Sequence, residues 1–156
     1  MFELKRTNNL DPDFLYLIPL LDTDLRSRYL TLQDVYDQHN IIVNVDTVVI
    51  AYAEGQAVGC GCFKEFNGSS VEIKRMYVKP EHRRRGISSA VLNELEAWAI
   101  ESGYSEAVLE TGNQQDEAIA LYKKQGYVII PNYFPYETMG TSICMKKRLI
   151  TDTPSN

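Results

Sequence analysis

The chain has 156 residues, of which 44% are apolar and 24% are charged. Those proportions are typical of one globular domain, and they exclude a disordered chain and a protein embedded in a membrane. Sixteen Lys and Arg against 21 Asp and Glu give a net charge of −5, which disfavours general binding to nucleic acid or to an anionic membrane. Any anion site must therefore be local. We expect a single domain over residues 1–150 and a disordered tail over 151–156.

The cysteines indicate the compartment. Cys60, Cys62 and Cys144 are an odd number, and the chain opens without the basic and then apolar run of a signal peptide. A domain of this length needs no disulfide or metal to be stable. We therefore expect thiols in a reducing cytoplasm, with Cys60 and Cys62 as small core residues and no metal site. The longest apolar stretch, residues 14–21, is far shorter than the roughly 20 residues that span a bilayer.

The first third of the chain predicts a short strand followed by helices. Residues 3–7 form the strand, and Asp11 with Pro12 is typical of a helix start. We expect Pro19 to disturb this helix. The apolar spacing of residues 21–32 predicts a second helix, with a further turn through Val35 and Tyr36.

Three antiparallel strands come next in the prediction. β-Branched and aromatic runs indicate strands over 47–54, 57–66 and 71–78. Glu54-Gly55-Gln56 predicts the first turn, and Asn67-Gly68 predicts the second because both of its residues tolerate positive φ.

The second half of the chain alternates helices and strands. An apolar face at helical spacing predicts a helix from residue 87 to Gly103, and Gly126 is placed to end a later helix. The order strand, helix, strand, helix implies a parallel pair of strands. The full prediction is one α/β domain on a mixed sheet, with helices on both faces. Its remaining elements are a strand over 106–111, a helix over 116–125, strands over 127–130 and 142–147, and an aromatic loop over 131–140.

One segment between a predicted strand and a predicted helix is strongly basic. Between Glu72 and Gly86 there are six Lys or Arg against two Glu. The N–H groups at a helix N-terminus have no partner within the helix and attract phosphate groups. An isolated Arg-Arg-Arg-Gly is more often a solvated loop, but its position between a strand and a helix favours an anion site.

Two motifs in this part of the chain resemble the GNAT superfamily of N-acetyltransferases, and we identify the chain as a bacterial-type member. The family's acyl-CoA motif, Gln/Arg-x-x-Gly-x-Gly/Ala, matches residues 83–88, after an apolar-x-Val-x-Pro strand end at 76–80. The family's Asn-x-x-Ala-x-x-Leu-Tyr-x-x-x-Gly-Phe/Tyr matches residues 115–127. The resemblance covers the central third of the chain firmly and residues 1–46 only by topology.

The resemblance implies a GNAT-like acyl-CoA N-acyltransferase fold with a mixed, mostly antiparallel sheet. It also implies direct transfer of an acetyl group from acetyl-CoA to a primary amine of a small-molecule acceptor. Ser88 stands where the family prefers Gly or Ala, and Gln115 replaces the usual Asn, for which Asn113 could substitute. The residues implied in binding the co-substrate are Met76, Tyr77, Val78, Arg83, Arg84, Arg85, Gly86, Ile87, Ser88, Ser89, Asn113, Gln115 and Tyr122.

The same resemblance implies the chemical roles. The backbone of residues 76–78 would pair with the pantetheine arm like an added strand, and amides of residues 84–89 would hold the pyrophosphate. Tyr122 is the expected acid for the departing CoA thiolate. A protonated amine cannot attack a thioester, so a base is also needed. Glu72 is the first candidate and Glu110 the second.

The late aromatic loop is the remaining candidate for a substrate contact. Tyr133, Tyr136 and Glu137 could shape the acceptor pocket, although such loops also cover cores.

Two other functions stay open at this point. One is a non-catalytic acyl-CoA sensor or interaction module on the same fold, because fold does not fix function. The other is a nucleotide-phosphate-binding protein, which ranks lower because the chain lacks Gly-x-Gly-x-x-Gly and the Walker lysine pattern. We expect no nucleic-acid or membrane partner, and a homodimer stays open.

Overall fold

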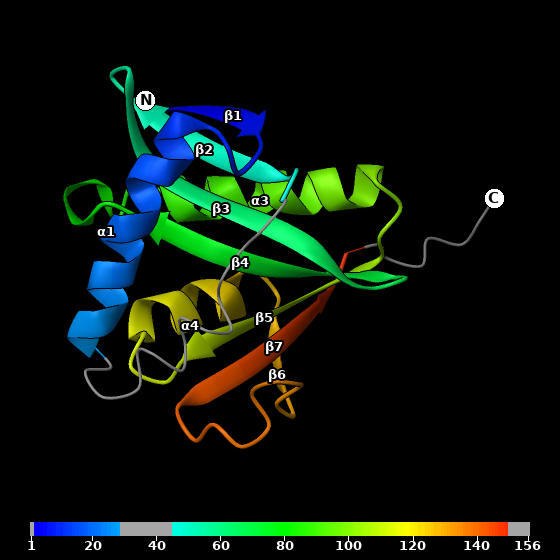
Figure 1. The fold of residues 1–156 in the computed structure, drawn as a ribbon. Helices are drawn as coiled ribbons and strands as arrows, with labels where there is room; N and C mark the ends of the chain where they lie inside the picture. Colours follow the sequence, from blue (N-terminus) through cyan, green and yellow to red (C-terminus); the bar gives the residue numbers. More distant parts are fainter. Residues whose placement is uncertain (1, 29–44, 150–156) are drawn as a thin grey trace. The chain divides into compact units, whose positions relative to one another are not determined.

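The computed structural model describes residues 2–28 and 45–149. Seven strands of the described residues form one sheet in the order β1-β2-β3-β4-β5-β7-β6 (Figure 1). Most of the strand pairs are antiparallel, and β4 pairs with β5 in parallel. The mixed α/β class and the parallel pair predicted from the sequence are therefore confirmed.

The chain divides into two compact units. We call residues 1–63 and 74–95 the N-terminal unit, and residues 64–73 and 96–156 the C-terminal unit. β3, β4 and the helix α3 each contribute residues to both units.

The N-terminal unit contains the first antiparallel strands. β1 pairs with β2 from Glu3↔Tyr52 to Thr7↔Val48, and β2 pairs with β3. Glu54 and Gly55, which join β2 to β3, have φ of 53° and 78°. Positive φ at both residues is the geometry of a tight hairpin turn, as predicted. The strands are β1 Glu3–Thr7, β2 Val48–Ala53, β3 Gln56–Asn67 and β4 Ser70–Val78.

The predicted break at Pro19 is wrong, because one continuous helix, α1, runs over Pro12–Arg28. A proline inside a helix removes one hydrogen bond and costs about 3 kcal/mol. Pro19 itself is exposed, and the opposite side of the helix is buried against the sheet. Burial of several large side chains outweighs that cost. The buried side chains of α1 are Phe14, Leu17 and Leu21.

The start of α1 agrees with its prediction. The Asp13 N–H donates to Oδ1 of Asp11 at 2.9 Å, so Asp11 caps the helix and Pro12 occupies its first position. The predicted helical residues 29–32 and 35–36 lie outside the described residues, and so does the tail over 151–156.

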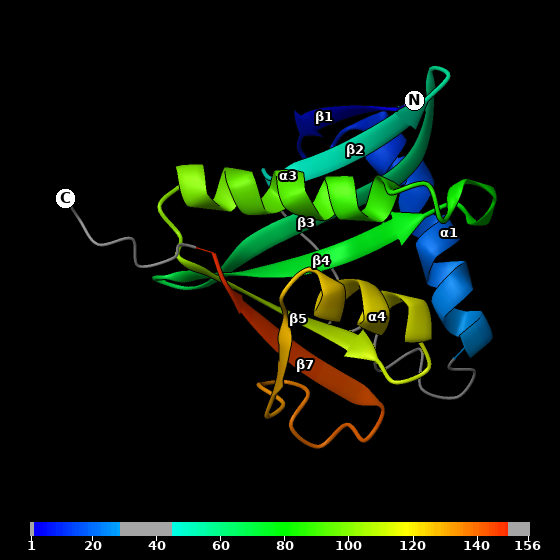
Figure 2. The same cartoon turned by 180° about the vertical axis from the view of Figure 1, so that it is seen from behind.

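The side chains of β3 alternate between the two faces of the sheet. In the N-terminal unit, one set packs against α1 and the other against α3. Cys60 and Cys62 belong to the core that α1 covers. Gly59 and Gly61 face the first turns of α3, Ile87–Glu101. In Figure 1 α1 lies in front of the sheet, and in Figure 2 α3 lies in front. Helices on both faces are therefore confirmed for this unit.

Gly61→Ala is expected to lower the free energy of unfolding by about 1–2 kcal/mol, because the Met76 side chain and the helix α3 leave no room for a methyl group. A Cβ at Gly61 would lie 2.5 Å from Sδ of Met76, 3.0 Å from a methyl carbon of Leu95 and 3.1 Å from one of Val91. Urea unfolding would measure the change. Gly68→Ala is the matched control, since a Cβ at Gly68 meets nothing within 4 Å. Equal stability of the two variants would contradict this packing.

The turn between β3 and β4 differs from its prediction. It consists of Gly68 and Ser69, and neither Asn67 nor Gly68 has positive φ. The side chain of Asn67 instead accepts a hydrogen bond from the Ser69 N–H at 2.9 Å. Such an Asx turn reverses the chain without left-handed backbone.

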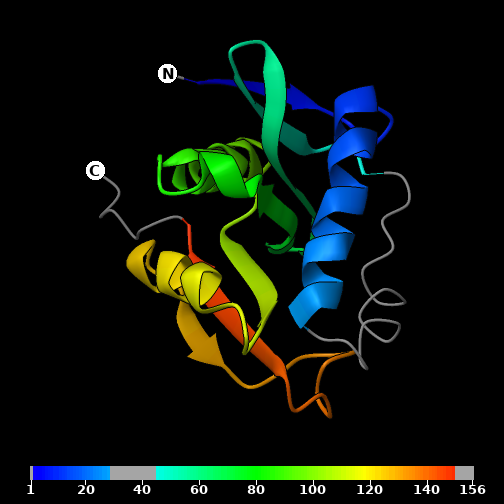
Figure 3. The same cartoon turned by 90° about the vertical axis from the view of Figure 1, so that its left-hand side faces the viewer.

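The C-terminal unit is built around β5. The N-terminal half of β4 pairs with it in parallel from Ser70↔Glu106 to Ile73↔Leu109, and β7 pairs with it antiparallel along its length. Figure 3 shows β5, β7 and β6 with the helix α4 beside them. The elements of this unit are β5 Glu106–Gly112, α4 Asp116–Lys124, β6 Val128–Ile130 and β7 Ser142–Arg148.

Two glycines end the helices as predicted. Gly103 and Gly126 have φ of 96° and 100°. After α4, the Tyr127 N–H donates to the carbonyl of Tyr122 at 2.9 Å and the Gly126 N–H donates to that of Lys123 at 3.1 Å. This pair of bonds is a Schellman motif, and the same pattern closes α3.

Candidate functional site

The basic segment forms a loop between the end of β4 and the start of α3, within the N-terminal unit. A short 3₁₀ turn over Pro80–His82 leads into it. Arg84 and Gly86 then have φ of 65° and 79°. The Gly86 carbonyl accepts from the Ala90 N–H at 3.0 Å, so the helix begins directly after Gly86. Left-handed residues at alternate positions turn backbone amides toward one side, as in anion-binding nests.

Gly86 is required for its conformation and not for packing within the protein. Its φ lies in the region that favours glycine, and a Cβ there would meet no atom within 4 Å. The space beside this residue is therefore open, and the first turn of α3 begins next to it. An open space at a helix N-terminus accommodates an anion such as a phosphate.

The three arginines of the loop have different surroundings. Arg84 and Arg85 are exposed. Arg83 instead holds the loop in place, because its Nε donates to the Val78 carbonyl at 2.9 Å and its Nη2 lies 3.7 Å from a carboxylate oxygen of Asp24. Two arginines are thus exposed to solvent beside the helix start, and the third fixes the backbone that carries them.

β4 changes its backbone geometry before it reaches this loop. Arg75 has φ of 58° in the middle of the strand, a conformation that arginine rarely adopts. Its Nη1 lies 2.6 Å from Oδ1 of Asp22, in a largely buried ion pair. The ladder with β5 ends at Ile73, whereas β4 continues to Val78. Sequence reasoning missed this feature, because no glycine or asparagine marks the position.

Tyr122 is the most unusual side chain of the C-terminal unit. It lies on α4 and is only 6% exposed, and its ring contacts the ring of Tyr127 edge-on, with centroids 5.9 Å apart. No hydrogen-bond partner for its hydroxyl occurs among the described residues. Burial, with a contribution from the Glu110 carboxylate, raises the pKa of Tyr122, so the hydroxyl keeps its proton at neutral pH.

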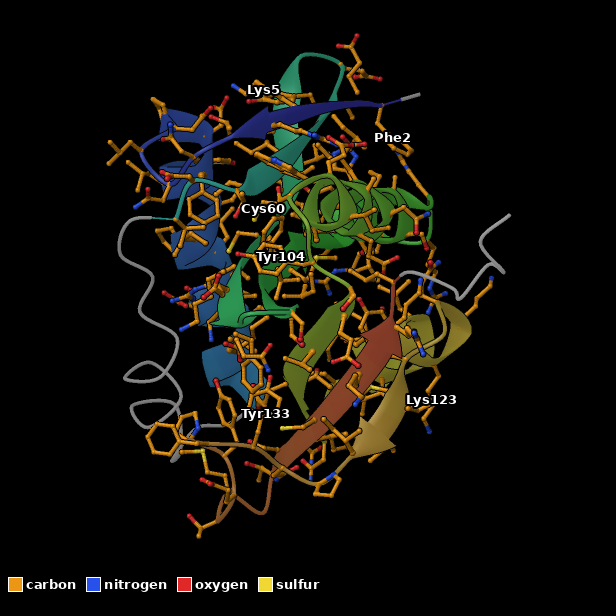
Figure 4. All side chains as sticks on the ribbon, turned by 90° about the vertical axis from the view of Figure 1, so that its right-hand side faces the viewer. Phe2, Lys5, Cys60, Tyr104, Lys123 and Tyr133 are labelled. Carbon is orange, nitrogen blue, oxygen red and sulfur yellow. The ribbon has the colours of Figure 1, made fainter. Side chains whose placement is uncertain are left out.

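Glu72 is a buried carboxylate of the same unit, with 5% exposure. The Tyr133 hydroxyl donates to its Oε2 at 3.0 Å, and Nζ of Lys64 lies 3.9 Å from Oε1. Figure 4 labels Tyr133 on the loop before β7. Burial, with a contribution from Glu72, raises the pKa of Tyr133, so this phenol stays a hydrogen-bond donor. The sequence did not indicate this pair, because its members are far apart along the chain.

The late aromatic loop contains the other candidates for acceptor contacts. Tyr133 packs between Phe66 and Tyr136, with ring centroids 4.8 Å and 5.8 Å away. Tyr136 is fully buried, whereas Glu137 is exposed. Asn132, which the sequence did not single out, donates from Nδ2 to the carbonyls of Tyr136 and Ser142 at 3.1 Å and so closes the loop.

Three further predicted residues lie on β5 and on the segment between it and α4. Oε2 of Glu110 accepts a hydrogen bond from the Ser142 hydroxyl at 2.8 Å. The side chain of Asn113 is exposed. Gln115 folds back, and its Oε1 accepts from the Gly112 N–H at 2.9 Å. The carbonyl oxygen of Gln115 thus shapes the turn before α4.

The three cysteines are buried thiols. Sγ of Cys60 and Sγ of Cys62 donate to the carbonyls of Arg75 and Lys74 at 3.4 Å. Burial raises the pKa of Cys144 to about 11. Within residues 2–28 and 45–149, no group of three or more His, Cys, Asp or Glu side chains is placed to hold a metal ion.

None of the helices that the structure describes combines the length and the apolar character that a membrane crossing needs.

A mixed sheet of this strand order, with helices on both faces and a basic loop before α3, belongs to the acyl-CoA N-acyltransferase class of folds. The model of the Acetyltransferase (GNAT) family matches residues 14–127. The chain therefore belongs to this family and is an acyltransferase, which confirms the resemblance seen in the two motifs.

Individual relatives agree with the family. An IAA acetyltransferase of Azospirillum brasilense is 37% identical over 102 residues, which cover 65% of this chain and 67% of that protein. A Klebsiella pneumoniae structure described as an acyl-CoA N-acyltransferase has a TM-score of 0.80 and 30% identity, and the match covers 96% of this chain and 99% of that one. PaiA N-acetyltransferase of Thermoplasma acidophilum, solved with coenzyme A, shares the fold with a TM-score of 0.68, 19% identity and coverage of 95% and 99%.

Proposed function

We propose that this protein transfers an acetyl group from acetyl-CoA directly to the primary amine of a small molecule. The observation that carries the proposal is the buried Tyr122 hydroxyl, which has no hydrogen-bond partner among the described residues. A buried polar group without a partner costs about 1–3 kcal/mol. A ligand that accepts a hydrogen bond there removes that cost, and a departing thiolate is such a ligand.

The loop before α3 fits the pyrophosphate of coenzyme A. The left-handed Gly86 leaves open space beside the helix start, and Arg84 and Arg85 expose cationic groups there. The backbone amides of residues 84–89 would hold the phosphate oxygens, and the Ser88 hydroxyl would add a donor. The side chain of Arg83 would position the loop without touching the anion.

The end of β4 fits the pantetheine arm. Residues 76–78 continue beyond the ladder with β5, and their backbone groups would pair with the arm like an added strand. An amide near this strand end would also polarise the thioester carbonyl, which is worth about 3 kcal/mol at a developing oxyanion. When bound, acetyl-CoA supplies the acetyl group as a thioester whose carbonyl carbon an amine can attack.

Two side chains would move protons in the reaction. Glu72 accepts a proton from the amine, directly or through water, so that the nitrogen lone pair can bond to the carbonyl carbon. Tyr122 donates its proton to the sulfur as the carbon–sulfur bond breaks. The nitrogen loses a second proton as the amide forms, and this proton restores the Tyr122 hydroxyl. The products are an amide, the free thiol of CoA and the proton that Glu72 releases to water. Tyr133 holds Glu72 through its hydrogen bond and keeps one carboxylate oxygen in a fixed direction.

The acceptor would be a small amine that meets Tyr133 and Tyr136. The aromatic rings offer apolar and cation–π contacts, and the buried carboxylate of Glu72 favours a group that arrives protonated. The exposed Glu137 would act at the rim of such a site. Gln115 would contact the co-substrate through its amide nitrogen, because its carbonyl oxygen is already used in the turn.

An amine screen tests this function, with free CoA thiol as the readout. Amino acids, polyamines, aminoglycosides and short peptides are each supplied with acetyl-CoA. We expect thiol release that depends on one class of amine, and we expect Glu72→Gln to lower the turnover number by about 100-fold, as for loss of a general base. Binding of acetyl-CoA without amine-dependent release would support an acyl-CoA sensor instead.

Glu65→Gln is the matched control for Glu72→Gln. Oε1 of Glu65 accepts a hydrogen bond from the Tyr104 hydroxyl at 2.7 Å on the surface of the same unit. This variant therefore also weakens a tyrosine–glutamate pair, but away from the proposed site. We expect it to keep the wild-type turnover number. An equal loss in both variants would contradict the role of Glu72 as the base.

A further inference from the structure

A second buried carboxylate, Glu96, lies in the C-terminal unit and has no role in the proposed reaction. It occupies α3 and is 7% exposed. Its two oxygens accept from different donors: Oε2 from the Tyr127 hydroxyl at 2.8 Å, and Oε1 from Nζ of Lys147 at 2.7 Å. Burying a carboxylate lowers the stability of the fold unless cationic groups or hydrogen-bond donors contact its oxygens. Here an aromatic hydroxyl and an ammonium group do so.

The three residues come from three parts of the fold. Glu96 lies on α3, Tyr127 follows α4, and Lys147 lies on β7. Nζ of Lys147 also lies 5.8 Å from the centre of the Tyr127 ring. The Tyr127 ring is therefore held at its hydroxyl by a carboxylate and approached by the cation that pairs with that carboxylate. The hydrogen bond and the cation–π contact restrict the orientation of the Tyr127 ring in addition to packing.

Tyr127 also contacts Tyr122 in two ways. Its N–H donates to the Tyr122 carbonyl, which fixes the backbone at the end of α4. Its ring meets the Tyr122 ring edge-on, at a centroid separation of 5.9 Å. The Tyr122 hydroxyl has no hydrogen-bond partner of its own among the described residues, so its side chain meets Tyr127 through this ring contact alone.

We infer that Glu96 and Tyr127 are positioning residues for Tyr122, and that the hydrogen bond between them holds the acid in line for proton donation. This inference rests on the proposed function, in which Tyr122 is the acid. Tyr127→Phe keeps the ring, the backbone bond and the helix end, and it removes only the hydroxyl that Glu96 holds. The ring at position 127 then has no hydrogen bond to Glu96, and the Tyr122 ring packs against a ring that is free to shift.

The test is a double-mutant cycle on the full chain. Tyr122→Phe, Tyr127→Phe and the double variant are assayed by thiol release from acetyl-CoA, with hydroxylamine as a small amine acceptor and the uncatalysed rate subtracted. We expect Tyr127→Phe to lower kcat about tenfold, with KM for acetyl-CoA within about twofold, because small misplacements of a reacting group are costly. In the Tyr122→Phe background the same substitution should leave kcat unchanged, because no acid remains to position.

Two controls separate positioning from general damage. Tyr104→Phe removes an equivalent tyrosine–glutamate bond on the surface of the same unit (Tyr104 is labelled in Figure 4), and it should keep the wild-type kcat. Glu96→Gln keeps an acceptor for Tyr127 and should retain more activity than Glu96→Ala. Both comparisons are made at temperatures well below the measured unfolding transitions.

Each outcome decides the inference. A tenfold loss that disappears in the Tyr122→Phe background supports it. An unchanged kcat in Tyr127→Phe overturns it, and so does an equal loss in both backgrounds, because that pattern indicates a purely structural effect. If Tyr122→Phe alone leaves kcat unchanged, the proposed acid role fails and this inference fails with it. A loss in Tyr122→Phe without a loss in Tyr127→Phe overturns this inference alone.

Discussion

Gly86→Glu is expected to abolish acetyl-CoA binding in a protein that still folds. The new side chain would occupy the open space beside the start of α3 and would place a negative charge where the pyrophosphate is proposed to bind. It would also force a non-glycine residue to φ of 79°, which costs about 1–3 kcal/mol. Calorimetric titration with acetyl-CoA should show an affinity at least about 100-fold weaker than that of the wild type.

The chain offers a closely matched control for this variant. Gly55 has φ of 78°, and a Cβ there also meets nothing within 4 Å, but it lies in the hairpin between β2 and β3. Gly55→Glu therefore carries the same backbone strain and the same added charge at a different place. It should bind acetyl-CoA as the wild type does. Unchanged affinity in folded Gly86→Glu would refute the assignment of this loop.

Tyr122→Phe should lower the turnover number by about 100-fold or more and leave the affinity for acetyl-CoA within about twofold. The phenylalanine keeps the ring contact with Tyr127 and removes the only proton donor that we assign to the departing sulfur. The free energy of unfolding, in contrast to the turnover number, should not fall. Because the lost hydroxyl is buried and has no partner among the described residues, the free energy of unfolding should stay unchanged or rise by up to about 1 kcal/mol.

Steady-state kinetics and urea unfolding together test Tyr122→Phe. A variant that is slower and also less stable would indicate a structural hydroxyl with a partner in the folded protein. Equal rates in the wild type and the variant would remove Tyr122 from the acid role, whatever its stability. The contrast between lost activity and retained stability is the result that only a catalytic hydroxyl would give.

Most elements of the fold could be predicted because their signals are local. The alternation of β3 placed Cys60 and Cys62 on one face, and Gly103 and Gly126 marked helix ends through their need for positive φ. Pro19 was misjudged, because its local penalty is smaller than the burial of the α1 face against the sheet. That burial is a tertiary effect, and it cannot be read from the residues around the proline.

In the site, too, features that depend on neighbouring residues could be predicted, and features that depend on distant residues could not. The loop around Gly86 was predicted from contiguous residues, and the structure gives it the left-handed backbone that such a loop requires. The left-handed Arg75, the pairing of Glu72 with Tyr133, and the burial of Glu96 were not predicted. These features depend on partners from distant parts of the sequence, whose contacts arise only from the tertiary structure.

The helix end after α4 affects how the second family motif should be interpreted. In Leu-Tyr-x-x-x-Gly-Tyr, the spacing between the two tyrosines is that of one hydrogen bond and of the ring contact at the helix end. The glycine donates the second hydrogen bond of the Schellman motif, to Lys123. A sequence with phenylalanine at position 122 would satisfy all of these and would lack the acid of the proposed mechanism. The motif therefore identifies a way of ending a helix, and a family match through it says little about turnover. In the proposed mechanism, one oxygen among the atoms of this helix end would distinguish an enzyme from an inactive relative of the same shape.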